Sequence, residues 1–160
     1  MASRRKGRIL AFQALYFWEA AGSSQRTSQR TATSSEKQAL PEGLLDFSWL
    51  GSEKQARLDQ SISDFSRLLI LGTIENIRAI DKMIREHLKN WDFSRVNRVD
   101  LAVLRISTYT LMYQADIPPS IVINEAIGIS REFGTDDSYR FVNGVLDSIR
   151  KTLQNPKGPD

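Results

Sequence analysis

The first eight residues of the chain contain four cationic side chains: Arg4, Arg5, Lys6 and Arg8. Residues 1–30 carry a net charge of +5, whereas the whole 160-residue chain carries only +3, so the remaining residues sum to −2. Positive charge confined to one end of a slightly acidic protein suits local binding of a polyanion, and nucleic-acid phosphate is the obvious candidate. Arginine predominates among the four, and its planar guanidinium suits bidentate phosphate contacts and stacking on unpaired bases.

These four residues, called the basic head below, lead without a linker into an apolar stretch at residues 9–18. The spacing predicts a helix buried on several sides, and a docked helix would hold the head at a defined place on the surface. A solvated, disordered terminus is the alternative that composition alone leaves open.

Residues suited to catalysis or metal binding are sparse. The absence of cysteine excludes disulfides, thiolate zinc sites and cysteine nucleophiles. The single histidine, His87, lies in a charged stretch typical of a solvated surface rather than of a general base. The glycines stand singly, so no phosphate-cradling loop is present, and helix capping accounts for the Asp136–Asp137 pair. The sequence therefore predicts a protein that is not an enzyme, with no catalytic residue, metal site or cofactor.

The apolar stretch at residues 9–18 is too short to span a bilayer, and no small-residue cleavage site follows it. We expect a mature cytoplasmic protein. Length and composition fit a single helical domain over residues 1–153, followed by a flexible tail at 154–160.

Apolar periodicity predicts an all-α fold, a compact bundle of six or seven helices. The first helix is expected to start after Ser3 as its N-cap and to run to about Ala21, where Gly22 stops it. Residues 22–36 contain no apolar side chain larger than Ala and are expected to form a mobile loop. A brief helix is expected within residues 44–50.

Four further helices complete the expected bundle. Ser52 is expected to cap a long helix ending near Asn90, in which Gly72 marks a close helix crossing or a bend. The next helix runs through residues 101–112 and is followed by Pro118–Pro119. Pro119 then starts a helix that Phe133–Gly134 ends, and the last helix begins near Thr135.

Several segments, in this order along the chain, resemble the NusB family of bacterial transcription antitermination factors. They are the arginine-rich run before Gln13–Tyr16, the segment Asp100–Ile106, the segment Ile123–Ile127, and the long segment Phe133–Leu146. Residues 22–50 depart from the family pattern, because they are longer and rich in Ser and Thr, and nothing is inferred for them from the resemblance.

The resemblance implies a double three-helix bundle that binds the boxA element of ribosomal RNA leader transcripts. It further implies a heterodimer with NusE, a protein of the small ribosomal subunit, and a place in the antitermination complex that supports elongation by RNA polymerase. By motif position, the implied RNA-binding residues are Arg4, Arg5, Lys6, Arg8, Gln13 and Asp137. The implied partner-binding residues are Tyr16, Asp100, Arg105 and Phe141.

Residue types alone suggest plainer roles for the same positions. Residue type alone predicts that Tyr16 and Phe141 are core residues and that Asp100 and Arg105 are ordinary solvated charges. With the resemblance, we expect the Phe141 ring to be at least partly exposed. Two other function classes remain open: a helical DNA-binding regulator, although no helix presents a row of Arg, Asn and Gln for a major groove, and a pure protein-interaction bundle.

Overall fold

The computed structural model describes residues 2–26, 40, 41, 43–89 and 92–154. Within these ranges the chain forms seven α-helices, two 3₁₀-helices and no strand. The α-helices are α1 (Ala2–Arg26), α2 (Ser52–Ala56), α3 (Gln60–Glu75), α4 (Ile77–Glu86), α5 (Arg98–Tyr113), α6 (Pro119–Phe133) and α7 (Ser138–Gln154). The 3₁₀-helices are η1 (Ser48–Leu50) and η2 (Phe93–Arg95). The all-α bundle expected from the sequence is confirmed.

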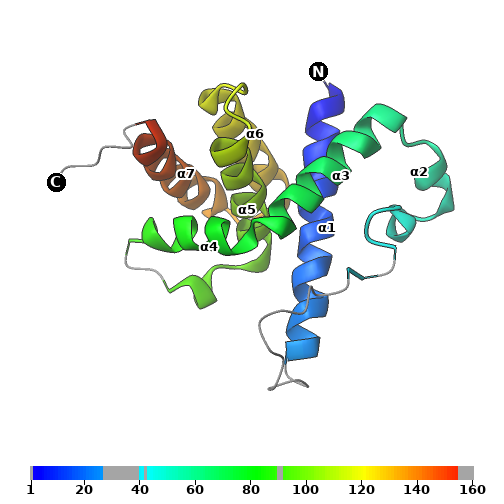
Figure 1. The fold of residues 1–160 in the computed structure, drawn as a ribbon, viewed down its shortest axis with the longest axis horizontal. Coiled ribbons are helices and arrows are strands. Elements are labelled where there is room, and N and C mark those ends of the chain that lie inside the picture. Colours follow the sequence, from blue (N-terminus) through cyan, green and yellow to red (C-terminus); the bar gives the residue numbers. More distant parts are fainter. Residues whose placement is uncertain (1, 27–39, 42, 90–91, 155–160) are drawn as a thin grey trace.

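Helix α5 is the centre of the fold. It packs against α1 and α3 on one side, against α6 and α7 on the other, and along α4 (Figure 1). Residues 101–108 of α5 are all buried, as expected for a helix surrounded by others. The two groups α1–α3–α5 and α5–α6–α7 therefore share one helix and one hydrophobic core.

Helix α1 differs from its expected boundaries at both ends. It begins at Ala2, so Ser3 lies inside the helix rather than capping it, and it continues through Gly22 to Arg26. A glycine lowers helix stability by about 1 kcal/mol without forbidding the helix. The expected mobile loop at residues 22–36 is therefore wrong for its first five residues, and residues 27–36 lie outside the described part of the chain.

The single long helix expected over residues 52–90 is wrong, because three helices occupy this range. Asp59 caps α3, and Asn76 separates α3 from α4 by donating its side-chain amide to the Gly72 carbonyl at 2.8 Å. Asn and Asp side chains compete with helical hydrogen bonds in this way. Gly72 does mark a close crossing as expected, since a Cβ there would overlap the Tyr109 ring of α5.

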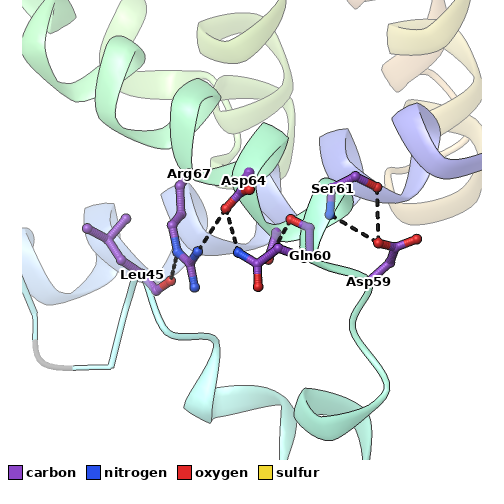
Figure 2. Close-up of polar contacts among 7 residues, drawn as sticks. Leu45, Asp59, Gln60, Ser61, Asp64 and Arg67 are labelled. Carbon is purple, nitrogen blue, oxygen red and sulfur yellow. Dashed lines mark hydrogen bonds and ion pairs between the residues drawn. The ribbon is translucent and has the colours of Figure 1, made fainter.

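Figure 2 shows local polar contacts that begin α3 and one contact, from Arg67, that reaches the segment before α2. The Asp59 carboxylate accepts from the Ser61 amide at 3.1 Å, and Gln60 donates to Asp64 at 2.8 Å. Arg67 donates to the Leu45 carbonyl at 2.8 Å. The expected brief helix within residues 44–50 is present only as η1, and the Arg67 contact fixes the chain just before it.

The C-terminal helices follow the sequence more closely. Pro119 is the first residue of α6, and Phe133 is the last, as expected. Helix α7 begins at Ser138, three residues after the expected start near Thr135, because Thr135 donates its amide to the Ser138 hydroxyl at 2.9 Å in the turn. Residues 155–160 of the expected tail lie outside the described part of the chain.

Candidate nucleic-acid interface

The basic head is anchored to the bundle at Gly7. The Ser66 hydroxyl of α3 donates to the Gly7 carbonyl at 2.8 Å, and a Cβ at this position would overlap the Phe65 ring. Gly7 is therefore a point of close helix packing, as small residues allow. The backbone that carries the head cations is therefore held at a fixed place against α3.

Three of the four head residues face solvent. Arg4, Arg5 and Lys6 are exposed, and Arg5 forms an ion pair of 3.4 Å with Glu132 at the end of α6. Both side chains of this pair are about half exposed, at 49% and 53%, so water screens their attraction strongly. A phosphate group can compete for Arg5 at little cost.

Arg8, the fourth head residue, is buried with only 5% of its surface exposed. Its guanidinium lies 5.7 Å from the centre of the Phe65 ring and 4.0 Å from a carboxylate oxygen of Glu125. Burial lowers the pKa of Arg8 below its ordinary value, and the Glu125 charge offsets part of this effect. In this arrangement Arg8 supports the base of the head, and its expected RNA contact stays a prediction that its burial does not favour.

Gln13 and Tyr16 of α1 meet in an open groove of about 420 Å³. Its other lining residues are mainly aromatic or aliphatic: Phe12, Phe17, Trp49, Leu50, Lys54, Val99 and Phe133. The Phe12 and Phe133 rings lie 5.0 Å apart, which connects the groove to the end of α6. We call this the α1 groove. The sequence analysis did not predict the α1 groove. The only pattern that indicated it was that the apolar residues of the first helix occupy more than one face.

Arg105 is buried and fully engaged. It donates to both carboxylate oxygens of Asp81 at 2.9 Å and to Glu19 at 3.0 Å. Burial by itself lowers the pKa of Arg105, but the hydrogen bonds and charges of Asp81 and Glu19 outweigh it, and the net shift is upward. The expectation of an ordinary solvated charge is wrong here, and the implied contact with a partner stays a prediction.

Asp100 is also buried, at 5% exposure, so the expectation of a solvated charge is wrong for it as well. Its carboxylate accepts from the Asn97 side chain at 3.2 Å. Burial raises the pKa of Asp100, and a hydrogen bond with Ser138 lowers it by less. Asp100 therefore lies just beneath the surface, next to Val99 of the α1 groove.

The remaining implied residues lie at the junction between α6 and α7. Asp137 is exposed, and Phe141 is half-buried against the core, so the expected partial exposure of its ring is confirmed. His87 differs from the expected surface residue, because its ring bonds the Met83 carbonyl at 2.7 Å and the Thr152 hydroxyl at 2.8 Å. It connects α4 to α7.

Three adjacent residues at the end of α6 contact the head, the α1 groove and the start of α7. Glu132 pairs with Arg5 of the head, Phe133 borders the α1 groove, and Arg131 contacts Tyr139 at the start of α7. These contacts make the head together with the end of α6 the candidate interface.

Among the described residues, no group of His, Cys, Asp or Glu could hold a metal ion, and no helix is long and apolar enough to cross a membrane.

Residues 5–151 match the family model described as the NusB family. The chain belongs to the NusB family. It is 50% identical over 151 residues to the transcription antitermination protein NusB of Treponema pallidum (strain Nichols), an alignment that covers 93% of each chain. The resemblance inferred from the sequence motifs is confirmed.

Solved structures share the fold. The NusB structure from T. maritima has a TM-score of 0.71 and 33% identity, covering 92% of this chain and 90% of that one. A crystal structure of the antitermination factors NusB and NusE in complex with dsRNA matches with a TM-score of 0.74, covering 95% and 98%. At 22% identity, this second match supports the NusB fold alone.

Proposed function

We propose that the chain is an RNA-binding transcription antitermination factor. It binds the boxA element of ribosomal RNA leader transcripts, forms a heterodimer with NusE, and acts in the antitermination complex that supports elongation by RNA polymerase. This role is that of a binding protein, and it assigns no catalytic step to any residue. Membership in a family of antitermination proteins and the anchored basic head both support it.

The exposed cations of the head carry the proposal. Arg4, Arg5 and Lys6 project from one helix end that Gly7 fixes against α3. Because the backbone beneath these cations is already fixed, binding phosphate requires ordering of their side chains only, and arginine planes also stack on the unpaired bases of single-stranded RNA. Gln13 on the same helix and Asp137 near the end of α6 complete the proposed RNA surface.

Replacement of Arg4, Arg5 and Lys6 by Ala tests this surface. We expect weaker binding to single-stranded boxA RNA and a salt dependence flatter by about 0.7 on the log-log slope for each lost phosphate contact. The matched control replaces three exposed cations elsewhere, Arg78, Lys82 and Lys89, by Ala. If both variants lose affinity equally, net charge rather than the head governs binding.

The same measurement separates the other function classes. Scrambled RNA and duplex DNA of equal length serve as competitors. Preference for duplex DNA would indicate a DNA-binding regulator, and no nucleic-acid binding at all would indicate a pure protein-interaction bundle. Selective binding of boxA RNA supports the proposed function.

For NusE, the α1 groove is the proposed site; Tyr16 lines it together with Gln13 of the RNA surface, and Phe141 on α7 is a second proposed contact outside the groove lining. Aromatic side chains in an open groove make good anchors for a protein partner. Asp100 and Arg105, which are buried, contribute by holding α5 in position rather than by direct charge. This divides the implied partner residues into two that touch NusE and two that shape its site.

Phe141→Ala tests the partner site. We expect a loss of NusE affinity on the order of 2 kcal/mol, and a loss of stability well below the roughly 3 to 5 kcal/mol typical of a buried Phe. Titration calorimetry with purified NusE and thermal melting measure the two effects. Tyr16→Ala should give a similar loss of affinity. Unfolding of Phe141→Ala without a separate binding defect would make Phe141 a core residue and contradict its assignment.

A further inference from the structure

A second cationic cluster lies at the junction between α6 and α7. The Arg131 guanidinium lies 4.6 Å from the centre of the Tyr139 ring, and that of Arg140 lies 5.5 Å from it. Arg140 also donates its Nε–H to the Tyr139 hydroxyl at 2.9 Å. We call these three residues the arginine–tyrosine cluster. Both arginines are exposed, and Tyr139 is half-buried.

Each of the two guanidinium groups contacts the Tyr139 side chain, and the charge of Asp137 also acts on Arg140. Within the part of the chain that the structure describes, neither forms an ion pair, in contrast to Arg67 with Asp64 and Arg150 with Asp147. Long exposed side chains normally lose rotamer freedom when they bind a ligand. Here contact with the Tyr139 side chain already restricts both arginines in the free protein, so binding a ligand costs less of their conformational entropy.

The cluster adjoins the basic head through the end of α6. Arg131 and Glu132 are neighbours in sequence, and Glu132 pairs with Arg5. The Arg5 guanidinium also lies against Gly128, one helical turn before Arg131, where a Cβ would come within 3.5 Å of it. Residues of α1, α6 and α7 therefore place cationic side chains around the end of α6, with Glu132, Asp136 and Asp137 as acidic groups in the same region.

We propose that the arginine–tyrosine cluster is a second contact for the same single-stranded RNA that binds the basic head. It takes a phosphate and an unpaired base that lie beyond the nucleotides held by Arg4, Arg5 and Lys6. The guanidinium planes stack on the base and donate to phosphate oxygens. This inference rests on the proposed function, and it extends the RNA path along the end of α6.

An acidic protein segment is the other class of ligand that two arginines could bind. The ordered guanidinium planes favour RNA, because stacking on a base uses the plane, whereas a flexible acidic chain needs only the charge. The contacts of Arg5 with Glu132 and Gly128 on α6, which bring the head close to the cluster, point the same way.

The experiment measures affinity against RNA length. Single-stranded RNAs containing boxA are lengthened one nucleotide at a time, at each end, and binding is measured for the wild type, for Arg131→Ala with Arg140→Ala, and for Arg78→Ala with Lys82→Ala as the control. We expect a stepwise gain of about tenfold at one length for the wild type and the control, the low end of the effect of one stacked base. The cluster variant should lack this step and still bind the shortest RNA normally.

Tyr139→Leu tests whether the contact needs the arginines held by the ring or only their positive charge. The variant keeps both arginines and the net charge but removes the ring that contacts them, so the gain in affinity at that RNA length should become smaller. Thermal melting checks that the variant is folded. As a direct readout, a 4-thiouridine at the nucleotide where the step occurs should crosslink to the peptide that contains Tyr139.

Each other outcome overturns the inference in a recognisable way. If the head variant loses RNA affinity but the length profile of the cluster variant matches the wild type, the second contact is absent and the proposed function stands. If the cluster variant loses NusE affinity instead, the cluster binds protein. If the wild type binds none of these RNAs, both the inference and the proposed function are wrong.

Discussion

Arginine side chains near the two ends of α1 differ in their surroundings: those at its start belong to α1 and are exposed, whereas the one near its other end belongs to α5 and is buried. At the start of the helix, Arg4 and Arg5 are exposed, and the one ion pair there, between Arg5 and Glu132, is open to water. Near the other end, Glu19 of α1 joins Asp81 in holding Arg105, whose side chain is only 4% exposed. An exposed arginine is available to a ligand, whereas a buried arginine paired with two carboxylates is part of the fold. Burial and ion pairing therefore determine which role an arginine has.

The buried end should give the largest effect when it is broken. Arg105→Ala leaves two carboxylates without their cation, and we expect a loss of about 3 to 5 kcal/mol of unfolding free energy, measured by urea denaturation. Arg150→Ala, which breaks the partly exposed pair with Asp147, serves as the control and should cost at most about 1 kcal/mol. Equal losses would remove the distinction between the two kinds of arginine.

Arg8 sharpens the comparison because it belongs to the head in sequence but to the core in structure. Arg8→Ala should cost about 1 to 3 kcal/mol of stability, since it leaves the Glu125 carboxylate unpaired and removes the packing over Phe65. Arg5→Ala, its exposed counterpart, should melt like the wild type. If instead Arg8→Ala keeps full stability and loses RNA affinity, Arg8 leaves its buried position to bind RNA.

Asp100 and Asp147 form the acidic counterpart of the comparison. Because burial raises the pKa of Asp100, the folded protein binds this proton more tightly than the unfolded chain does. Its contribution to stability is therefore lost as the pH rises from about 3.9, the ordinary Asp value, through the raised native pKa. Asp100→Asn should become more stable relative to the wild type across this interval, as urea denaturation at a series of pH values would show.

Asp147 should behave with the opposite sign. Hydrogen bonds from Arg150 and Lys151 lower its pKa, so its contribution is present above the ordinary Asp value and is lost as the pH falls through the lowered native pKa. Asp147→Asn should therefore lose stability relative to the wild type near neutral pH and lose less in acid. The same sign for both variants would contradict the burial argument for Asp100.

The smallest effect is expected at the exposed end. Glu132→Gln removes the carboxylate that competes with phosphate for Arg5, and we expect RNA affinity to rise a few-fold, in keeping with an exposed pair worth less than about 1 kcal/mol. Glu86→Gln, beside Lys82, is the control and should leave RNA affinity unchanged. A fall in affinity for Glu132→Gln would mean that this carboxylate positions Arg5 for RNA.

How much of the fold the sequence predicts depends on how local each cause is. The boundaries of α6 were predicted because Pro119 and Gly134 act on their own backbone. The break at Asn76 was missed, since it depends on one side chain turning back to Gly72. The sequence also predicted the exposure of Arg4, Arg5 and Lys6, which depends only on composition and on the docked helix that follows, but it did not predict the burial of Arg8.

The buried charges could not be predicted in the same way. The partners of Arg105 lie 24 and 86 residues away along the chain, so its pattern looks like that of any solvated arginine. Arg8 is comparable, because its burial depends on Phe65 and Glu125. The family motifs marked these positions as important, but only the packing distinguishes a residue that binds a ligand from one that supports it.

The contact at Gly7 has a consequence for protein synthesis. The head is made first, but the residues that fix its base, Ser66 of α3 and Glu125 of α6, emerge from the ribosome later. At about 5–20 residues per second, α6 is complete on the order of ten seconds after the head. Until then the nascent chain exposes a basic peptide with no fixed geometry. The head therefore reaches its fixed geometry, and can bind RNA in that geometry, only when most of the chain has been translated.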